Sequence, residues 1–251
     1  MRKPWLIGIA LVLSPSAWAL GLYEASTIVT GMDQRSRPAG LAQTLGQVLA
    51  KVSGNPDLVA DARLAAVDPL PMLRNLAYLD RMSDQLMHDE QGSRDRPFDL
   101  IARYDPAAID ALLHSWNQPP WPLPRPTLAI AIRIHPRIGP EFPLHGDTDP
   151  DERHRAALLA AADRFGLMLA LPLTLGAANP PPGAPVLSGA PVLSGALGWS
   201  DADAGWSGQW HLTWHGADHA WGLRGVGFDA AYRDAVAGAA RILSGHQNPA
   251  R

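Results

Sequence analysis

The sequence of 251 residues contains no cysteine. This absence excludes a disulfide-stapled fold, a thiol nucleophile and a lipid-modified N-terminal cysteine. An excess of positive charge is also lacking, because 21 lysine and arginine residues face 24 aspartate and glutamate residues. The basic patch typical of nucleic-acid-binding proteins is therefore not expected, and no nucleic-acid partner is predicted.

Long apolar runs are missing after the N-terminal segment, so no membrane-spanning helix of about 20 residues is predicted there. What the sequence does have is 47% hydrophobic and 18% charged residues. This composition excludes a disordered or collagen-like chain. It supplies enough apolar material for the cores of one or two globular domains.

The N-terminal segment has the pattern of a secretory signal peptide. Arg2 and Lys3 precede an apolar run at 5–13, and Ala17-Trp18-Ala19 fits a small-x-small cleavage site. The apolar run has about half of the ~20 residues that a membrane anchor needs. We therefore expect residues 1–19 to be removed by cleavage after Ala19. Export to a bacterial periplasm follows, with the formal net charge changing from -3 to -5.

A proline-rich segment divides the remaining chain. Residues 117–126 contain five prolines in ten positions. Such a run cannot enter a helix or a central strand and favours an extended conformation. The sequence therefore predicts an N-terminal domain at 20–116, a linker at 117–126 and a C-terminal domain at 127–251.

The N-terminal domain is predicted to be an α+β sandwich, with helices on one face of a mostly antiparallel sheet. Its long helix is indicated by apolar residues spaced to share one face, namely Leu41, Leu45, Val48, Leu49 and Val52. Gly54 ends this helix, and Asp105-Pro106 has the form of an N-cap that begins another. The other expected elements are a strand at 22–30, one or two short helices within 57–77, and strands at 78–87 and 98–104 around a loop.

The C-terminal domain is predicted to have the same α+β character. Asp149-Pro150 is a typical helix start, and Gly166 ends that helix. Residues 167–173 are all apolar, which favours a strand at the centre of the sheet. The duplicated Gly-Ala-Pro-Val-Leu-Ser at 183–188 and 189–194 is interpreted as a surface loop leading into a strand. The other expected elements are strands at 127–134, 192–199, 206–214 and 219–226, with a turn at 216–218, and a last helix from Phe228 to Gly245.

Three histidines form the first candidate site. His211, His215 and His219 are spaced by four residues, which on a helix would align three zinc ligands. The alternation of tryptophan indicates a strand instead, with His211 and His215 on its solvent-facing side. A solvated polar face is the favoured interpretation. A metal site remains the alternative, if His219 meets the other two across a hairpin.

The tryptophans form the second candidate site. Trp206, Trp210 and Trp214 alternate with polar residues and lie on one face of the predicted strand. The favoured interpretation is a half-buried core face. An exposed row that binds glycan or protein is the alternative.

Sequence motifs for catalysis are incomplete. Gly205-Trp206-Ser207-Gly208 is one residue short of a nucleophile elbow and precedes a strand. Residues 222–227 carry glycines in the reverse order of a dinucleotide fingerprint. Helix capping accounts for the acidic residues Asp149, Asp151 and Glu152. We therefore predict no catalytic residue and no cofactor.

Several motifs resemble a known family. They are Leu49-Ala50-Lys51-Val52-Ser53-Gly54, the segment Arg103 to Leu113, Pro120-Trp121, and Arg125-Pro126 before an apolar strand. Together they resemble an uncharacterised proteobacterial envelope family, the domain of unknown function numbered twenty sixty-six. The resemblance covers mainly 20–135 and 158–245, and the proline-rich segment 176–191 departs from it. These are packing and turn motifs, so the resemblance implies an envelope location and transfers no catalytic residue.

The sequence leaves two functions open. The favoured one is a non-enzymatic periplasmic accessory protein that binds an envelope protein partner. The alternative is a periplasmic ligand binder, with glycan on the tryptophan hairpin or metal on His211, His215 and His219.

Overall fold

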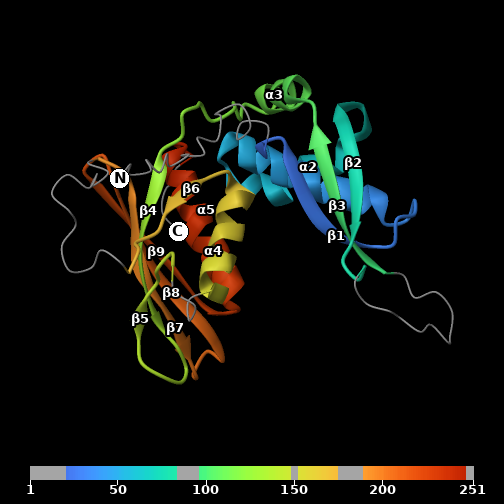
Figure 1. The fold of residues 1–251 in the computed structure, drawn as a ribbon. Coiled ribbons are helices and arrows are strands. Elements are labelled where there is room, and N and C mark those ends of the chain that lie inside the picture. The colour runs from blue at the N-terminus through green and yellow to red at the C-terminus, as the bar shows by residue number, and fades with distance from the viewer. Residues whose placement is uncertain (1–20, 84–95, 148–151, 175–188, 247–251) are drawn as a thin grey trace, which may run out of the picture.

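The computed structural model describes residues 21–83, 96–147, 152–174 and 189–246. Its elements form an N-terminal unit, residues 21–116, and a C-terminal unit, residues 127–246, each with its own sheet and hydrophobic cluster (Figure 1). The predicted signal peptide, the helix start at Asp149-Pro150 and the first copy of the duplication lie outside the described residues. Among the helices described, none has the length and apolar character needed to span a membrane.

The N-terminal unit contains a three-stranded antiparallel sheet. Its strands lie in the order β1 (Glu24–Thr30), β3 (Pro97–Tyr104) and β2 (Leu73–Asp80). Helix α2 (Arg37–Ser53) packs on one face of this sheet, and α3 (Pro106–Ser115) follows β3. The expected α+β character and the strand-helix-strand-strand-helix order are confirmed.

The predicted helix ends of this unit are also confirmed. Gly54 has a left-handed conformation with φ 76°, and its N–H donates to the carbonyl of Ala50. This conformation favours glycine, which explains why α2 ends here. At the start of α3, the carboxylate of Asp105 accepts a hydrogen bond from the N–H of Ala107, as an N-cap does.

The start of β2 was predicted wrongly. The strand begins at Leu73 instead of Tyr78 and ends at Asp80; residues 84–87 of the expected strand lie outside the description. The short helices expected within 57–77 are 3-10 helices, η1 (Pro56–Ala60), η2 (Ala62–Ala66) and η3 (Leu70–Met72). Asn55 and Asp61 cap the first two through their side chains. Pairing with β3 extends β2 toward its N-terminus, which composition alone did not indicate.

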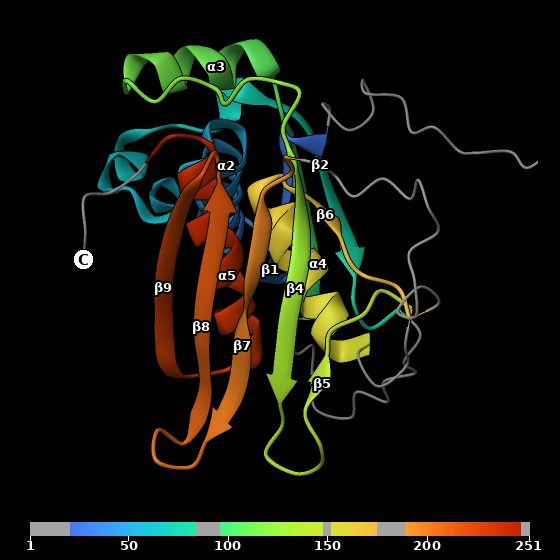
Figure 2. The same cartoon turned by 90° about the vertical axis from the view of Figure 1, so that its left-hand side faces the viewer.

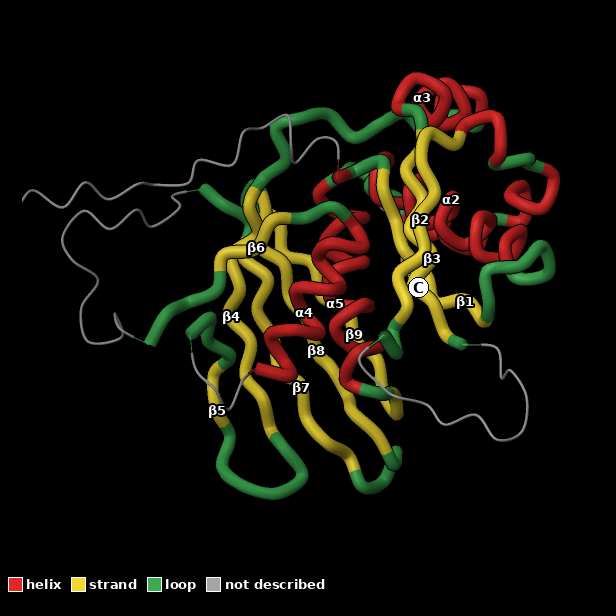
Figure 3. Tube along the Cα trace, turned by 45° about the vertical axis from the view of Figure 1, so that its right-hand side comes forward, coloured by secondary structure: helices red, strands yellow, loops and turns green. Residues whose placement is uncertain are grey.

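The C-terminal unit contains a six-stranded mixed sheet. Strands β5 (Phe142–Pro143), β4 (Thr127–His135), β7 (Val192–Ser200), β8 (Gly205–Trp214) and β9 (Ala217–Val226) follow one another, and β6 (Met168–Ala170) also pairs with β4. Helices α4 (Glu152–Phe165) and α5 (Phe228–Leu243) lie on the side that faces the N-terminal unit (Figures 1 and 3). Figure 2 shows the opposite face of the sheet, on which no described helix lies.

The segment 167–173 is not a central strand, contrary to expectation. Only Met168–Ala170 forms a strand, and it pairs with β4 alone, at the edge of the sheet. The central position is taken by β7, which runs parallel to β4 and antiparallel to β8. Leu167 is buried against the helices, whereas Met168 and Leu173 are exposed. The apolar run therefore correctly indicated contact with the core, but it did not show that the strand pairs along one of its edges only.

A buried tyrosine joins the sheet and helix of the N-terminal unit. The hydroxyl of Tyr104 donates to the carbonyl of Leu41 at 3.0 Å and lies 2.8 Å from the hydroxyl of Thr44. Both partners belong to α2, so this contact fixes the helix over β3. Burial raises the pKa of Tyr104 to about 12.

This pKa predicts a loss of stability at high pH. The folded state favours the protonated phenol, so its contribution is complete below the unfolded pKa of about 10 and is lost as the pH rises toward 12. We expect the free energy of unfolding of the native protein to fall by roughly 3 kcal/mol more than that of Tyr104→Phe over this range. Urea unfolding at several pH values measures the difference. Parallel curves for the two proteins would contradict the assignment.

Candidate functional site

The two units are joined by a buried arginine. Arg125 is 5% exposed and donates to the carbonyl oxygens of Lys51 at 2.8 Å, Val52 at 2.8 Å and Gly166 at 3.0 Å. These carbonyls belong to the last turn of α2 and to the residue that follows α4. Helix ends present carbonyls without intrahelical donors, so the guanidinium satisfies groups from both units. Burial lowers the pKa of Arg125 to about 10, which leaves it charged at neutral pH.

Further contacts surround this arginine. The Lys51 ammonium lies 3.4 Å from a carboxylate oxygen of Asp163, and Ser244 donates to the carbonyl of Gly54 at 3.0 Å. Gly166 has a φ of 63°, and a Cβ there would lie 2.6 Å from the Arg125 guanidinium. The junction therefore requires glycine at the end of α4, for its conformation and for space.

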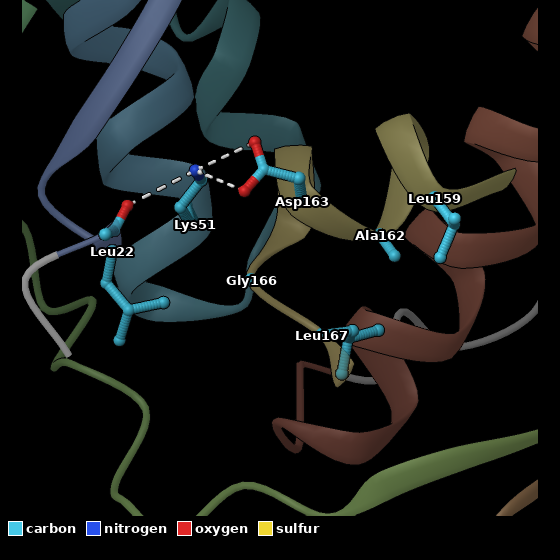
Figure 4. Close-up of a pocket in the computed structure, with 8 residues that line it drawn as sticks. Leu22, Lys51, Leu159, Ala162, Asp163, Gly166 and Leu167 are labelled. Atoms are coloured by element: carbon cyan, nitrogen blue, oxygen red, sulfur yellow. Dashed lines mark hydrogen bonds and ion pairs between the residues drawn. The ribbon is translucent and has the colours of Figure 1, made fainter. Parts of the chain in front are cut away.

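The first hollow lies beside the Lys51–Asp163 ion pair (Figure 4). It measures about 290 Å³, and leucines from both units give it an apolar wall. Lys51 reaches across its rim to Asp163 and also donates to the carbonyls of Gly21 and Glu24. The residues that line it are Gly21, Leu22, Lys51, Leu159, Ala162, Asp163, Gly166 and Leu167.

The second hollow shares Lys51 and Asp163 with the first and differs from it in charge. It measures about 280 Å³ between β1, α2, α4 and α5. Arg164 and Arg233 line it together with Asp229, Ser26 and Gln47. Its other lining residues are Ala25, Lys51, Ala157, Ala160, Ala161 and Asp163.

The N-terminal sheet also has a face without a described helix, opposite α2. Alternation along the strands places four apolar residues there, which we call the outer apolar face: Ile28, Ala77, Leu79 and Ile101. Ile28 is 57% exposed and Leu79 is 59% exposed. Asp99 lies between these two in the sheet register and forms an ion pair with Arg81 at 3.2 Å.

The three predicted histidines do not converge. His219 lies opposite the buried Leu212, so it is on the helix-covered face, whereas His211 is exposed on the other face. His215 lies in the turn with φ 49°, next to Gly216, and its ring packs on Trp214 with centroids 3.9 Å apart. The turn thus comes at 215–216, one residue before its predicted start. Across the described ranges, no group of three His, Cys, Asp or Glu side chains could hold a metal ion.

The tryptophans face the core. Trp210 is fully buried in the C-terminal cluster, and Trp206 and Trp214 are partly buried against it. Trp221, opposite Trp210 in β9, donates its indole N–H to the carbonyl of Asp234 on α5 at 3.4 Å. The predicted alternation is therefore confirmed. It places the row under the helices, where it cannot serve as an exposed stacking platform for glycan.

Sequence reasoning missed the arginines of the junction. In the sequence Arg125 belongs only to the Arg125-Pro126 motif, and Arg164 and Arg233 belong to no motif. An arginine within a proline run before an apolar strand was the available signal for Arg125. No pattern in the sequence indicated that Arg164 and Arg233 meet, because they belong to helices far apart in the chain.

Substitution of Arg125 tests the junction between the two units. Replacing Arg125 by methionine leaves the carbonyls of Lys51, Val52 and Gly166 without this donor. We expect the free energy of unfolding to fall by about 3 kcal/mol or more. The exposed Arg224→Met on β9 is the matched control, with an expected change within about 0.5 kcal/mol. Equal urea midpoints for the two variants would show that the hydrogen bonds of Arg125 contribute nothing to the free energy of unfolding.

Substitution of Trp210 tests the burial of the tryptophan row. Trp210→Ala empties a fully buried site, so we expect the free energy of unfolding to fall by about 3–5 kcal/mol. Its exposed neighbour His211→Ala should change it by less than about 0.5 kcal/mol. Chemical denaturation compares the two proteins. Equal stability of Trp210→Ala and His211→Ala would contradict the burial of Trp210 in the core.

Comparisons with known proteins add a coarse assignment. Residues 17–122 match a family model described as Domain of unknown function (DUF8605). This supports an uncharacterised domain in the N-terminal part, and it does not support the family numbered twenty sixty-six. No curated protein matches the chain. One solved structure, titled "Crystal structure of uncharacterized protein", is 13% identical and covers 50% of this chain and 94% of its own, with a TM-score of 0.22. A likeness this weak assigns neither fold nor function.

Proposed function

We propose that this protein is an exported, non-enzymatic accessory protein that binds a protein partner of the bacterial cell envelope. The outer apolar face of the N-terminal sheet is the docking surface in this proposal. The observation that carries it is the exposure of Ile28 and Leu79 on a sheet face that no described helix covers.

The arrangement of this face suits a protein interface. Ile101, in the middle strand, lies between Ser26 and Ala77 in the register, one pair along from Asp99, which lies between Ile28 and Leu79. The ion pairs Arg81–Asp99, within the face, and Glu24–Arg103, at its rim, add polar groups. Apolar residues among polar ones are the usual composition of an interface between proteins that also exist alone.

Charge favours a protein over a membrane surface as the occupant. The two ion pairs of this face balance, so it offers no net positive charge to anionic lipid. After removal of the predicted signal peptide, the whole chain has a formal net charge of -5. A neutral surface of mixed character is therefore better matched by a protein with its own paired charges.

The composition of the hollows favours binding over catalysis. Neither hollow has a histidine among its lining residues, so Ser26, which lines the second one, has no imidazole base there. Export is supported by the sequence of residues 1–19, with its positive start, short apolar run and Ala-Trp-Ala cleavage site.

Site-specific photo-cross-linking in cells tests the proposal. A photoreactive amino acid replaces Ile28 in one variant and Ile138, which is 89% exposed in the C-terminal unit, in the matched control. We expect one envelope protein to be captured at position 28 and not at 138. Leu79→Glu should reduce that capture at least tenfold, because it replaces an exposed apolar contact by a second carboxylate beside Asp99.

The outcomes separate the parts of the proposal. Equal capture at both positions, or capture that persists in Leu79→Glu, would overturn the docking surface. The mass of the captured chain also identifies its first residue, which should be Leu20. A chain that retains residues 1–19 in the cytoplasmic fraction would refute export.

A further inference from the structure

The second hollow brings two arginines together from different helices. Arg164 lies near the end of α4, and Arg233 lies in the second turn of α5. Neither forms an ion pair within 4.0 Å of a carboxylate among the residues described. Asp163, which also lines the hollow, is the partner of Lys51. Asp229 lines it too, one helical turn before Arg233, but no ion pair joins them.

The charges of this hollow do not cancel. Lys51, Arg164 and Arg233 supply three positive charges, against the two carboxylates of Asp163 and Asp229. Arg164 is half-buried, and both its burial and the positive charge of Arg233 lower its pKa. Arg233 is exposed at the mouth of the hollow, so the half-buried Arg164 bears the desolvation. An anion bound between two guanidinium groups that repel each other stabilises both.

The size and the neutral groups of the hollow point to a small ligand group. A volume of about 280 Å³ is below the range of sites for drug-sized molecules, roughly 300–1,000 Å³. Ser26 of β1 and Gln47 of α2 also line it, and they are polar residues without charge on the N-terminal side. Guanidinium groups bind planar carboxylates and phosphate oxygens through paired N–H donors.

We propose that the second hollow is a binding site for a small oxyanionic group, a phosphate or a carboxylate, held between Arg164 and Arg233. The ligand bridges α4 and α5 of the C-terminal unit and contacts Ser26 and Gln47 of the N-terminal unit. The site is separate from the outer apolar face, although Ser26 belongs to the same side of β1 as Ile28. It does not depend on the partner proposed above.

Calorimetric titration of the purified chain tests this site. Inorganic phosphate and acetate are titrated separately, at constant ionic strength, with sodium chloride as the reference for screening alone. We expect saturable binding of at least one of the two oxyanions. Binding of phosphate alone assigns a phosphate ligand, and binding of acetate with equal affinity assigns a carboxylate.

Three variants identify the residues. Arg164→Gln and Arg233→Gln should each weaken binding at least tenfold, and the exposed Arg224→Gln should leave it unchanged. Arg164→Lys keeps the charge and removes the paired donors, so it should fall between native and Arg164→Gln. It also provides the test at this position if Arg164→Gln fails to fold. Leu79→Glu should bind the anion normally, which keeps this result independent of partner docking.

Two results would contradict an anion site at the second hollow. Heats that match the chloride reference for both oxyanions would overturn the proposal. So would an unchanged affinity in Arg164→Gln and Arg233→Gln, because the anion would then bind elsewhere on the protein.

Discussion

The junction depends on one buried guanidinium that satisfies carbonyls from both halves of the molecule. Arg125 binds the last turn of α2 and the residue after α4, so it holds two helix ends together. Withdrawing this charge from water is costly, and the cost is offset only while its donors are occupied. The two units therefore share a constraint: if one moves away, buried donors and acceptors on both sides lose their partners.

The two hollows are consequences of that constraint. With the helix ends fixed, Lys51 meets Asp163, and both residues line the two hollows. The first hollow has leucines in its lining, and the second has Arg164 and Arg233 among alanines and polar residues. The outer apolar face of the N-terminal sheet shares β1 with the second hollow, through Ile28 and Ser26. The charged hollow thus comes from the way two ordinary α+β units are placed together, whereas the outer apolar face belongs to the N-terminal sheet alone.

Local chemistry explains which elements could be predicted from the sequence. Asp105 and Gly54 act within a few residues of themselves, so the ends of α3 and α2 follow from residue type. Tryptophan alternation in β8 reports which face meets the core, and this too is a local pattern. The place of residues 167–173 in the sheet could not be predicted from a local pattern. An apolar run is compatible with an edge strand packed under a helix as well as with a central strand. The start of β2 was missed because its pairing with β3, and not its composition, sets it.

The sequence by itself determined the α+β character, the C-terminal end of α2, the N-cap of α3 and the buried side of the tryptophan hairpin. Each of these depends on neighbours in the chain, where backbone preference and hydrophobic period act directly. Only the tertiary structure decided that His211 and His219 lie on opposite faces, because a hairpin's register fixes which residues share a side. It alone brought Arg125 to two helix ends and Arg164 to Arg233. Contacts between residues so far apart arise from packing, which leaves no periodic mark in the sequence.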